Sequence, residues 1–245
     1  MKNTLVDLKD ITFRYKKNLI LNKINLEIKE GDKIALLGKS GAGKSTLISI
    51  LNGTIKPTEG SIRYPIKEYK ELKKNKQINI GTIWQDLRLI DELTAEQNVN
   101  CGLLGQKSAL FAIANLLNIC SFKKAHICMG ICGLDNNIFL KNMNQISGGQ
   151  KQRVAIARSL IQEPTVLFAD EPFNNLDPKM AIKIKNIFLS NTISNRISIP
   201  KTLLFSLHRI ELLEGFNRII GLYNGRIIFN KEKENFKAYH LDKIY

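Results

Sequence analysis

Short apolar runs in the first third of the chain predict β-strands. Residues 5–8 and 11–15 predict one strand pair, and residues 24–28 alternate between apolar and polar side chains, as a half-buried strand does. Residues 34–37 form a continuous apolar run, which is typical of a strand buried on both faces of a parallel sheet. A glycine-rich segment and a predicted helix over residues 46–51 follow directly. We therefore expect strands that lead into a strand–loop–helix unit.

The rest of the chain divides into a helical middle and an alternating end. From about residue 86 to residue 145 the sequence lacks buried-strand runs, and apolar residues at steps of three and four predict a helix over residues 103–117. Asn224-Gly225 joins two short apolar runs and is typical of a hairpin turn. This order predicts an α/β core interrupted by a helical insertion. The elements expected after the insertion are helix 149–161, strand 166–169, helix 179–190, strand 202–206 and the hairpin strands 218–223 and 226–229.

The composition is that of a folded protein without a membrane span. The chain has 245 residues, of which 44% are hydrophobic and 24% are charged, so one large domain with a sizeable core is expected. No stretch of about 18 apolar residues occurs, which excludes a transmembrane helix. The first ten residues have no apolar segment and carry Asp7 and Asp10, so we expect no signal peptide and a cytoplasmic protein.

The net charge is the one unusual feature of the composition. The chain has 37 Lys and Arg against 22 Asp and Glu, a net charge of +15. This excess has two interpretations: a nucleic-acid or acidic-membrane partner, or lysines spread over a solvated surface. The densest basic run, residues 67–76, interleaves Glu68 and Glu71 at helical spacing, as an ordinary exposed helix would. The charge by itself leaves the partner open.

The four cysteines do not predict a metal site. Cys101, Cys120, Cys128 and Cys132 form no C-x-x-C pair, and Cys128 and Cys132 share one helix face near His126. That spacing matches no common zinc pattern. We interpret the cysteines as small buried apolar residues in a reducing compartment.

A glycine-rich loop predicts a nucleotide-binding site. The segment from Gly38 to Ser45 matches the phosphate-loop pattern G-x-x-x-x-G-K-[ST], and Thr46 follows it. Glycines let backbone N–H groups surround crowded phosphate charges, and the next helix points its positive end at them. In this pattern Lys44 reaches the β- and γ-phosphates and the Ser45 hydroxyl binds Mg²⁺. The buried strand before the loop and the helix after it supply the required context.

Acidic and polar side chains follow three other predicted strands. Asp170 and Glu171 end the apolar run 166–169, and in P-loop proteins an acidic residue at that place holds Mg²⁺. Asp170 is the candidate for this role, and Glu171 would then activate the attacking water. The Gln85 side chain is able to contact both Mg²⁺ and the attacking water. The His208 side chain is able to contact the γ-phosphate. Taken alone, Gln85 and His208 would be ordinary strand-end residues.

A second anion-binding helix start changes this interpretation. Residues 146–150, Ile-Ser-Gly-Gly-Gln, place glycines and a hydroxyl at the beginning of a helix. With this motif the sequence resembles the ATP-binding cassette (ABC) ATPases over nearly its whole length. The resemblance implies one domain, residues 1–245, with a P-loop NTPase (RecA-like) α/β core at about 1–85 and 160–245. It also implies an antiparallel β subdomain, and a helical subdomain at about 86–159.

The resemblance further implies roles for single residues, with ATP and Mg²⁺ as cofactors. Two ATP molecules are held in a head-to-tail homodimer, in which the 147–150 signature of one protomer completes the site of the other. Tyr15 stacks on adenine, and Leu176-Asp177 lies at the dimer contact. The ATP-binding residues implied are Tyr15, Gly38, Lys39, Ser40, Gly41, Ala42, Gly43, Lys44, Ser45, Thr46, Ser147, Gly148, Gly149 and Gln150. The catalytic residues implied are Glu171, His208, Gln85 and Lys44, and the Mg²⁺ ligands are Ser45, Gln85 and Asp170.

The sequence departs from the family pattern in three places. Ile146 replaces the usual leucine, Lys39 stands where proline is frequent, and Asn174-Asn175 stand where small residues are usual. None of these changes removes a catalytic group. We therefore expect an active ATPase.

Three longer stretches resemble the phosphonate-type transport ATPases: residues 51–62, 97–105 and 218–230. With a single cassette and no long coiled-coil insertion, the chain looks like the energising subunit of an ABC importer for phosphonate or a related phosphorus-containing or anionic solute. Residues 85–94 also resemble the cell-division ATPase, and residues 169–177 the lipoprotein-release ATPases, so both complexes remain alternatives. Pro178, directly after Asp177, fits the importers better than the lipoprotein-release ATPases.

The importer interpretation implies partners at a membrane. Integral-membrane permease subunits would dock at a groove near residues 85–98, a solute-binding protein would act indirectly, and the chain would be peripheral on the cytoplasmic face of the inner membrane. We expect no nucleic-acid partner. A nucleic-acid-associated ABC ATPase remains a less favoured alternative because of the charge, and steeply salt-dependent DNA binding would support it.

Overall fold

A computed structural model describes residues 3–64, 79–119, 122–190 and 197–245. The chain forms two compact units, of which the first comprises residues 1–80, 165–171 and 201–245. The second unit comprises residues 81–164 and 172–200. The helix expected over residues 67–76 lies outside the described residues.

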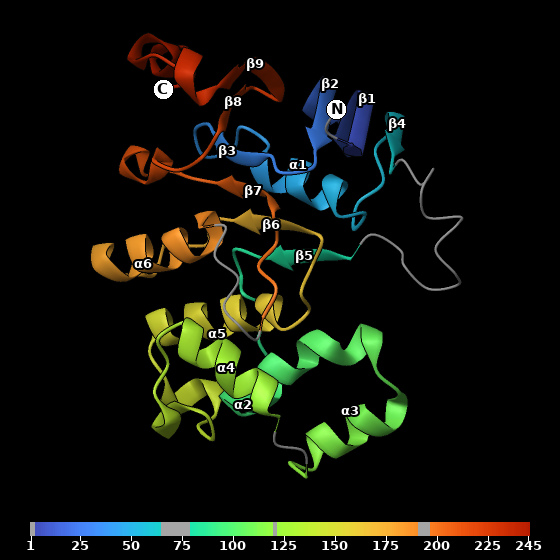
Figure 1. Ribbon diagram of the computed structural model, residues 1–245. Helices are drawn as coiled ribbons and strands as arrows, with labels where there is room; N and C mark the ends of the chain where they lie inside the picture. Colours follow the sequence, from blue (N-terminus) through green and yellow to red (C-terminus); the bar gives the residue numbers. More distant parts are fainter. Residues whose placement is uncertain (1–2, 65–78, 120–121, 191–196) are drawn as a thin grey trace. The chain divides into compact units, whose positions relative to one another are not determined.

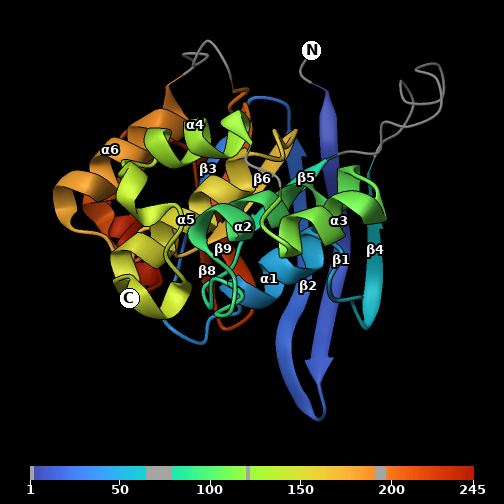
Figure 2. The same ribbon diagram turned by 90° about the horizontal axis from the view of Figure 1, so that it is seen from below.

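One sheet of the first unit is antiparallel. Strands β1 (Thr4–Tyr15), β2 (Asn18–Lys29) and β4 (Glu59–Arg63) lie in the order β2-β1-β4, and Figure 2 shows the long β1–β2 ribbon. The prediction that residues 5–8 and 11–15 pair with each other was wrong, because both belong to β1. Asp10 has φ 50° and the register shifts between Leu8 and Ile11, so this irregularity interrupts the alternation within one continuous strand.

The other sheet of the first unit is mainly parallel. β3 (Lys33–Leu37) lies between β7 (Thr202–Ser206) and β8 (Arg218–Tyr223), and β6 (Val166–Asp170) pairs with β7 in parallel. β9 (Arg226–Glu232) closes the edge as the antiparallel partner of β8, which confirms the predicted hairpin. Every residue of β6 and β7 is buried, as expected for continuous apolar runs inside such a sheet.

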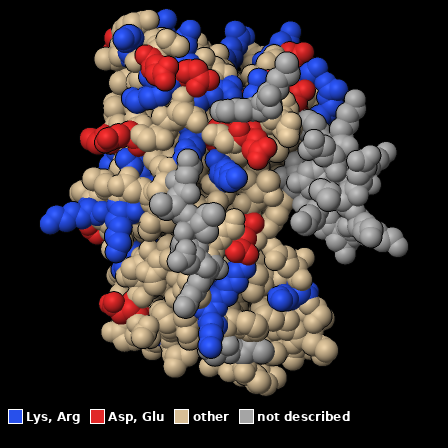
Figure 3. All heavy atoms as spheres, in the orientation of Figure 1, with Lys and Arg blue, Asp and Glu red and all other residues tan. Residues whose placement is uncertain are grey.

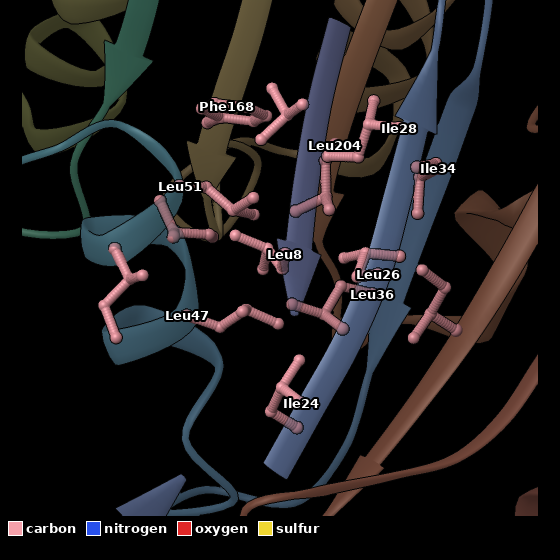
Figure 4. Packing of buried hydrophobic residues seen from close by; sticks show 14 of the residues in the cluster. Leu8, Ile24, Leu26, Ile28, Ile34, Leu36, Leu47, Leu51, Phe168 and Leu204 are labelled. Atoms are coloured by element: carbon pink, nitrogen blue, oxygen red, sulfur yellow. The ribbon is translucent and has the colours of Figure 1, made fainter. Parts of the chain in front are cut away.

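Helix α1 (Lys44–Leu51) joins the two sheets of the first unit through one hydrophobic core. Its side chains Leu47 and Leu51 are fully buried together with Leu8 of β1 and Leu36 of β3, as Figure 4 shows. Burying a side chain of this size contributes about 2 kcal/mol, so these contacts hold the start of α1 firmly against the end of β3. The core therefore determines where the loop between β3 and α1 lies.

The second unit is mainly helical, and Figure 1 shows α2 and α4 beside α5. Its strand β5 (Ile80–Ile83) begins at the last residue of the first unit. The α-helices are α2 (Ala95–Asn100), α3 (Ala109–Leu116), α4 (Lys123–Ile131), α5 (Gly148–Leu160) and α6 (Pro178–Leu189). The 3₁₀ turns of the two units are η1 (Cys101–Gln106), η2 (Asn136–Ile138), η3 (Met143–Gln145), η4 (Ile210–Leu213), η5 (Lys233–Asn235) and η6 (Ala238–Lys243).

The single helix predicted over residues 103–117 was wrong. The segment contains the 3₁₀ turn η1, a break at Lys107, and then α3, which begins after Ser108. The extended ψ angles of 166° at Lys107 and 165° at Ser108 interrupt the helical backbone between η1 and α3. Within η1 the backbone of Gly102 packs closely on α5, since a Cβ there would lie 2.3 Å from the Arg158 carbonyl oxygen. Among the described residues no helix is long and apolar enough to cross a membrane.

Candidate nucleotide site

The loop between β3 and α1 has the backbone that a phosphate-binding loop requires. Gly43, the residue before α1, has φ 103°, a backbone conformation that residues other than glycine rarely adopt. At Gly38 a Cβ would lie 2.3 Å from the Leu222 carbonyl oxygen of β8. The β8–β9 turn also contacts the loop, because the Gly225 N–H donates a 3.1 Å hydrogen bond to the Ala42 carbonyl. The loop is therefore held in place by contacts with β8 and the β8–β9 turn. The N-terminal N–H groups of α1 have no side-chain cap.

Lys44 places a cation inside this loop. The residue is 5% exposed, and its Nζ donates hydrogen bonds to the carbonyl oxygens of Gly38 at 2.7 Å and Lys39 at 3.0 Å. Burial lowers the pKa of Lys44, while the negative charges of Glu171 and Asp170 act in the opposite direction. The ammonium group is thus a hydrogen-bond donor close to two carboxylates. When a nucleotide binds, it is able to donate to phosphate oxygens in place of the loop carbonyl oxygens.

The carboxylates at the end of β6 are organised by Ser206 of β7. The Ser206 hydroxyl donates a 2.6 Å hydrogen bond to Asp170 Oδ1 and accepts a 2.9 Å hydrogen bond from the Glu171 N–H. Asp170 and Ser206 are direct register partners in the parallel pair of strands, and both are buried. Glu171 has φ 51°, a left-handed backbone conformation. This conformation ends β6 and turns the Glu171 side chain away from the direction of the strand. One hydroxyl therefore orients both acidic residues.

His208 contacts the carboxylate of Glu171 through Nε2 and Oε1. The His208 side chain is 34% exposed and that of Glu171 is 11% exposed, so the pair lies at the surface of the first unit with the carboxylate on the inner side. The structure thus brings together four of the residues singled out from the sequence, Lys44, Asp170, Glu171 and His208, all within the first unit.

Other predicted residues of the first unit lie at its surface. Tyr15 ends β1 and is 62% exposed, as a ring available for stacking would be. Ser45, in the first turn of α1, is exposed, and Thr46 is partly buried. Lys39, Ser40 and Gly41 of the loop are exposed as well. These positions are open to a ligand.

The signature residues begin helix α5 in the second unit. Ser147 is its N-cap, and its hydroxyl accepts a 3.3 Å hydrogen bond from the Gln150 N–H. The Gln150 side chain accepts a 2.8 Å hydrogen bond from the Ser147 N–H in return, which completes a capping box. Gly149 is needed for packing, because a Cβ there would lie 2.9 Å from the Asn175 carbonyl oxygen. The two glycines leave the start of the helix open to an anion.

The remaining predicted residues of the second unit have local partners too. Gln85 is exposed just after β5. Asn175, one of the departures from the family pattern, donates a 3.3 Å hydrogen bond to the Gln152 side chain of α5. Leu176 is buried, and the Asp177 carboxylate caps α6 by accepting a 3.0 Å hydrogen bond from the Met180 N–H. The loop before α6 is therefore tied to the signature helix within this unit.

Two residues near the site were missed from the sequence. Ser206 shows only as a small polar residue at the end of an apolar run, and nothing in the sequence says which strand lies beside it. Tyr245 accepts a hydrogen bond from the Gly38 N–H; burial raises the pKa of Tyr245 and this bond opposes the rise. The neighbouring Ile244 is fully buried, which anchors this contact. Both residues act on the loop or its carboxylates through tertiary contacts.

The cysteines of the second unit are free thiols where they are described. Cys128 and Cys132 are buried, and Cys101 is partly buried. Burial raises the pKa of the Cys128 thiol to about 12 and that of Cys132 still further. Thiols with such high pKa values are neutral at physiological pH and are poor nucleophiles. Cys120 lies outside the described residues.

Comparisons with known proteins identify the family. The sequence pattern of the ABC transporter family matches residues 21–174. The chain is 34% identical to the phosphonates import ATP-binding protein PhnC of Fusobacterium nucleatum, over 99% of this chain and 98% of that protein. It is also 34% identical to PhnC 2 of Oceanobacillus iheyensis, over 99% of this chain and 96% of that protein.

Solved structures support the same family. The dimeric bacterial ABC transporter cassette MJ0796 matches with a TM-score of 0.78 and 32% identity, over 94% of this chain and all of that one. A second structure of that cassette, in a post-hydrolysis state bound to ADP and phosphate, matches with a TM-score of 0.77. These likenesses confirm the predicted α/β fold of the P-loop ABC ATPases. The chain belongs to the ABC transporter family, as one of its ATPase cassettes.

Proposed function

We propose that this chain is the ATP-hydrolysing subunit of an importer for phosphonates or a closely related phosphorus-containing anion. The nearly full-length similarity to import proteins named for phosphonates, in several bacteria, supports the substrate class. The observation that supports the chemistry is the hydrogen-bond network in which the Ser206 hydroxyl joins Asp170 and Glu171 beside Lys44. We call this network the node. This node orients the Asp170 carboxylate and the backbone of Glu171, the two acidic residues to which the proposed chemistry gives a role.

In the proposed reaction Lys44, Glu171 and His208 act on different parts of ATP and the attacking water. Lys44 and the loop N–H groups bind the β- and γ-phosphates of ATP. Glu171 takes a proton from the attacking water as the water oxygen bonds to the γ-phosphorus and the bond to the β–γ bridging oxygen breaks, which yields ADP and phosphate. His208 contacts the γ-phosphate and, through its contact with Glu171, orients that carboxylate.

The residues present fit a magnesium ion. Carboxylate and hydroxyl oxygens are the hard donors that Mg²⁺ prefers, and Asp170 is a buried carboxylate whose Oδ1 is oriented by Ser206. Ser45 and Gln85 would complete the protein ligands. A bound Mg²⁺ would neutralise charge on the phosphates.

The proposed assembly is a head-to-tail homodimer on a membrane permease. Ser147, Gly148, Gly149 and Gln150 of one protomer would cover the ATP held by the loop of the other, which is consistent with the open start of α5. Permease subunits would dock near residues 85–98 on the cytoplasmic side of the membrane, and a solute-binding protein would act through them.

Two experiments test this function separately. For the chemistry, Glu171→Gln should lower ATP hydrolysis by about 10² or more, the scale of a lost general base. The same variant should trap an ATP-bound dimer in size-exclusion chromatography. Glu211→Gln, at an exposed glutamate of η4, is the matched control and should hydrolyse ATP normally. Hydrolysis by Glu171→Gln at the wild-type rate would show that Glu171 is not the base.

For the substrate, cells that lack this chain should lose uptake of radiolabelled methylphosphonate and keep uptake of an amino acid. Complementation with the wild type should restore uptake, and complementation with Glu171→Gln should not. Normal phosphonate uptake in the deletion strain would contradict the proposed substrate class but not the ATPase assignment. Purification of the chain with its permease, rather than with cell-division or lipoprotein-release proteins, would separate the importer from those complexes.

A further inference from the structure

The second unit exposes five large apolar side chains on and just after helix α3. Single exposed apolar residues are common on soluble proteins, whereas a contiguous group marks an interaction surface. We call this group the α3 face. Its members and their exposed fractions are Leu110 at 77%, Ile113 at 53%, Leu116 at 62%, Leu117 at 64% and Ile119 at 71%.

Hydrogen bonds fix the α3 face outward. The polar residue of α3, Asn115, is 2% exposed and points into the unit. Its side chain donates a 3.1 Å hydrogen bond to the Gln97 carbonyl, and its Oδ1 accepts a 3.1 Å hydrogen bond from Asn100. The Gln97 side chain donates to the Asn115 carbonyl at 2.7 Å. α3 is thus amphipathic, with its polar side buried against α2 and its apolar side exposed to solvent. This is the reverse of the usual orientation of a surface helix.

The charged residues of the segment that carries the α3 face are all lysines. Residues 101–134 contain three lysines and no Asp or Glu. Lys107, just before α3, and Lys123, just after the face, are exposed, whereas Lys124 pairs with Glu163 at 2.6 Å. Figure 3 shows no acidic residue over the α3 region at the lower right of the view. Two exposed cations therefore flank an apolar surface at its two ends.

We propose that the α3 face docks on an anionic lipid surface. A helix with an apolar outer side and flanking lysines matches the boundary between acyl chains and headgroups, because the apolar side chains enter it and the ammonium groups meet lipid phosphates. Residues 101–134 carry no carboxylate, and Glu163 is paired with Lys124, so the segment itself adds no negative charge that would repel such a surface. This contact would add to the attachment through the permease on which the proposed function rests.

Vesicle flotation tests this proposal with the purified chain alone. Wild-type protein should float with vesicles that contain about 30% phosphatidylglycerol in phosphatidylcholine, and not with phosphatidylcholine alone, because the flanking lysines need anionic headgroups. The double variant Leu110→Ser/Leu117→Ser should lower the floated fraction at least about fivefold, since two apolar anchors are lost. Leu140→Ser is the matched control, because Leu140 is 67% exposed in the same unit but lies outside the α3 face.

Three outcomes would overturn the proposal: no flotation of the wild type, equal loss in the Leu140→Ser control, or equal flotation of the double variant. A dimer in light scattering that the double variant abolishes would assign the face to a second copy of the chain instead. ATP hydrolysis by the double variant, measured in the same samples without lipid, shows whether it is folded. Flotation involves no phosphonate, so its result is independent of the uptake experiment.

Discussion

Ser206 and Asp170 are joined by a 2.6 Å hydrogen bond across two parallel strands, 36 positions apart in the sequence. The same hydroxyl accepts a hydrogen bond from the Glu171 N–H. A serine with no reactive role in the proposed chemistry therefore orients the Asp170 carboxylate and the backbone of Glu171. This relationship makes the ATPase node sensitive to a residue that never touches ATP.

Ser206→Ala should therefore damage hydrolysis. The substitution leaves the buried Asp170 carboxylate and the Glu171 N–H without this partner, which costs about 1–3 kcal/mol of stability and loosens both acidic groups. We expect a fall in kcat of about tenfold, because a small misplacement of a catalytic group is costly. Steady-state ATPase assays and urea denaturation measure the two effects.

Thr202→Val is the control on the same strand. The Thr202 hydroxyl accepts a 2.9 Å hydrogen bond from the Gly31 N–H at the other end of β7. Its loss should lower stability by about 1–3 kcal/mol and leave kcat unchanged. Equal kcat losses in both variants would show that the Ser206 effect is one of stability alone.

His208→Ala and His240→Ala should give opposite results. His208 is partly exposed beside Glu171, so its removal should reduce hydrolysis at least about tenfold with little change in Tm. His240 is 4% exposed and stacks on Tyr239, so its removal should lower Tm and leave the rate per folded molecule intact. Thermal unfolding and ATPase assays on both variants check this; a normal rate for His208→Ala would contradict the assigned role.

Lys44→Met should change how stability depends on pH. Burial holds the pKa of Lys44 below its ordinary value of 10.5, so between the folded pKa and 10.5 the unfolded chain binds more protons than the folded one. The free energy of unfolding of the wild type should therefore rise relative to the variant as pH increases through that window. Urea titrations from neutral pH to pH about 10 measure the difference, and a constant or falling difference would contradict the sign.

Tyr245→Phe should weaken ATP binding without slowing the chemistry. The phenol oxygen accepts the Gly38 N–H at the start of the phosphate loop, and one such bond is worth about 0.5–1.5 kcal/mol. We expect KM for ATP to rise about threefold with kcat unchanged, since the loop is less well held but the carboxylates are untouched. Tyr239→Phe, at a 58% exposed tyrosine of the same segment, should have no effect on KM.

Local patterns predicted most of the secondary structure, and the two failures have local causes. The continuous run of β3, the helix α1 and the Asn224-Gly225 turn were all predicted, because burial on both faces and positive φ angles constrain nearby residues directly. β1 was read as two strands because of the irregularity at Asp10. The break before α3 was missed because the apolar residues on both sides of Lys107 and Ser108 fit one helical spacing, although the backbone is extended at these two residues.

By itself the sequence determined the phosphate loop, the two strand-end carboxylates and the capped signature helix, because each needs particular residue types within a few positions. The tertiary structure decided which of these groups meet. The register of β6 against β7 places Ser206 beside Asp170, and His208 then reaches Glu171. It also decided that Asn115 is buried and its apolar neighbours are not. Contacts between strands and helices far apart in the chain depend on how the core packs, and no local pattern encodes that packing.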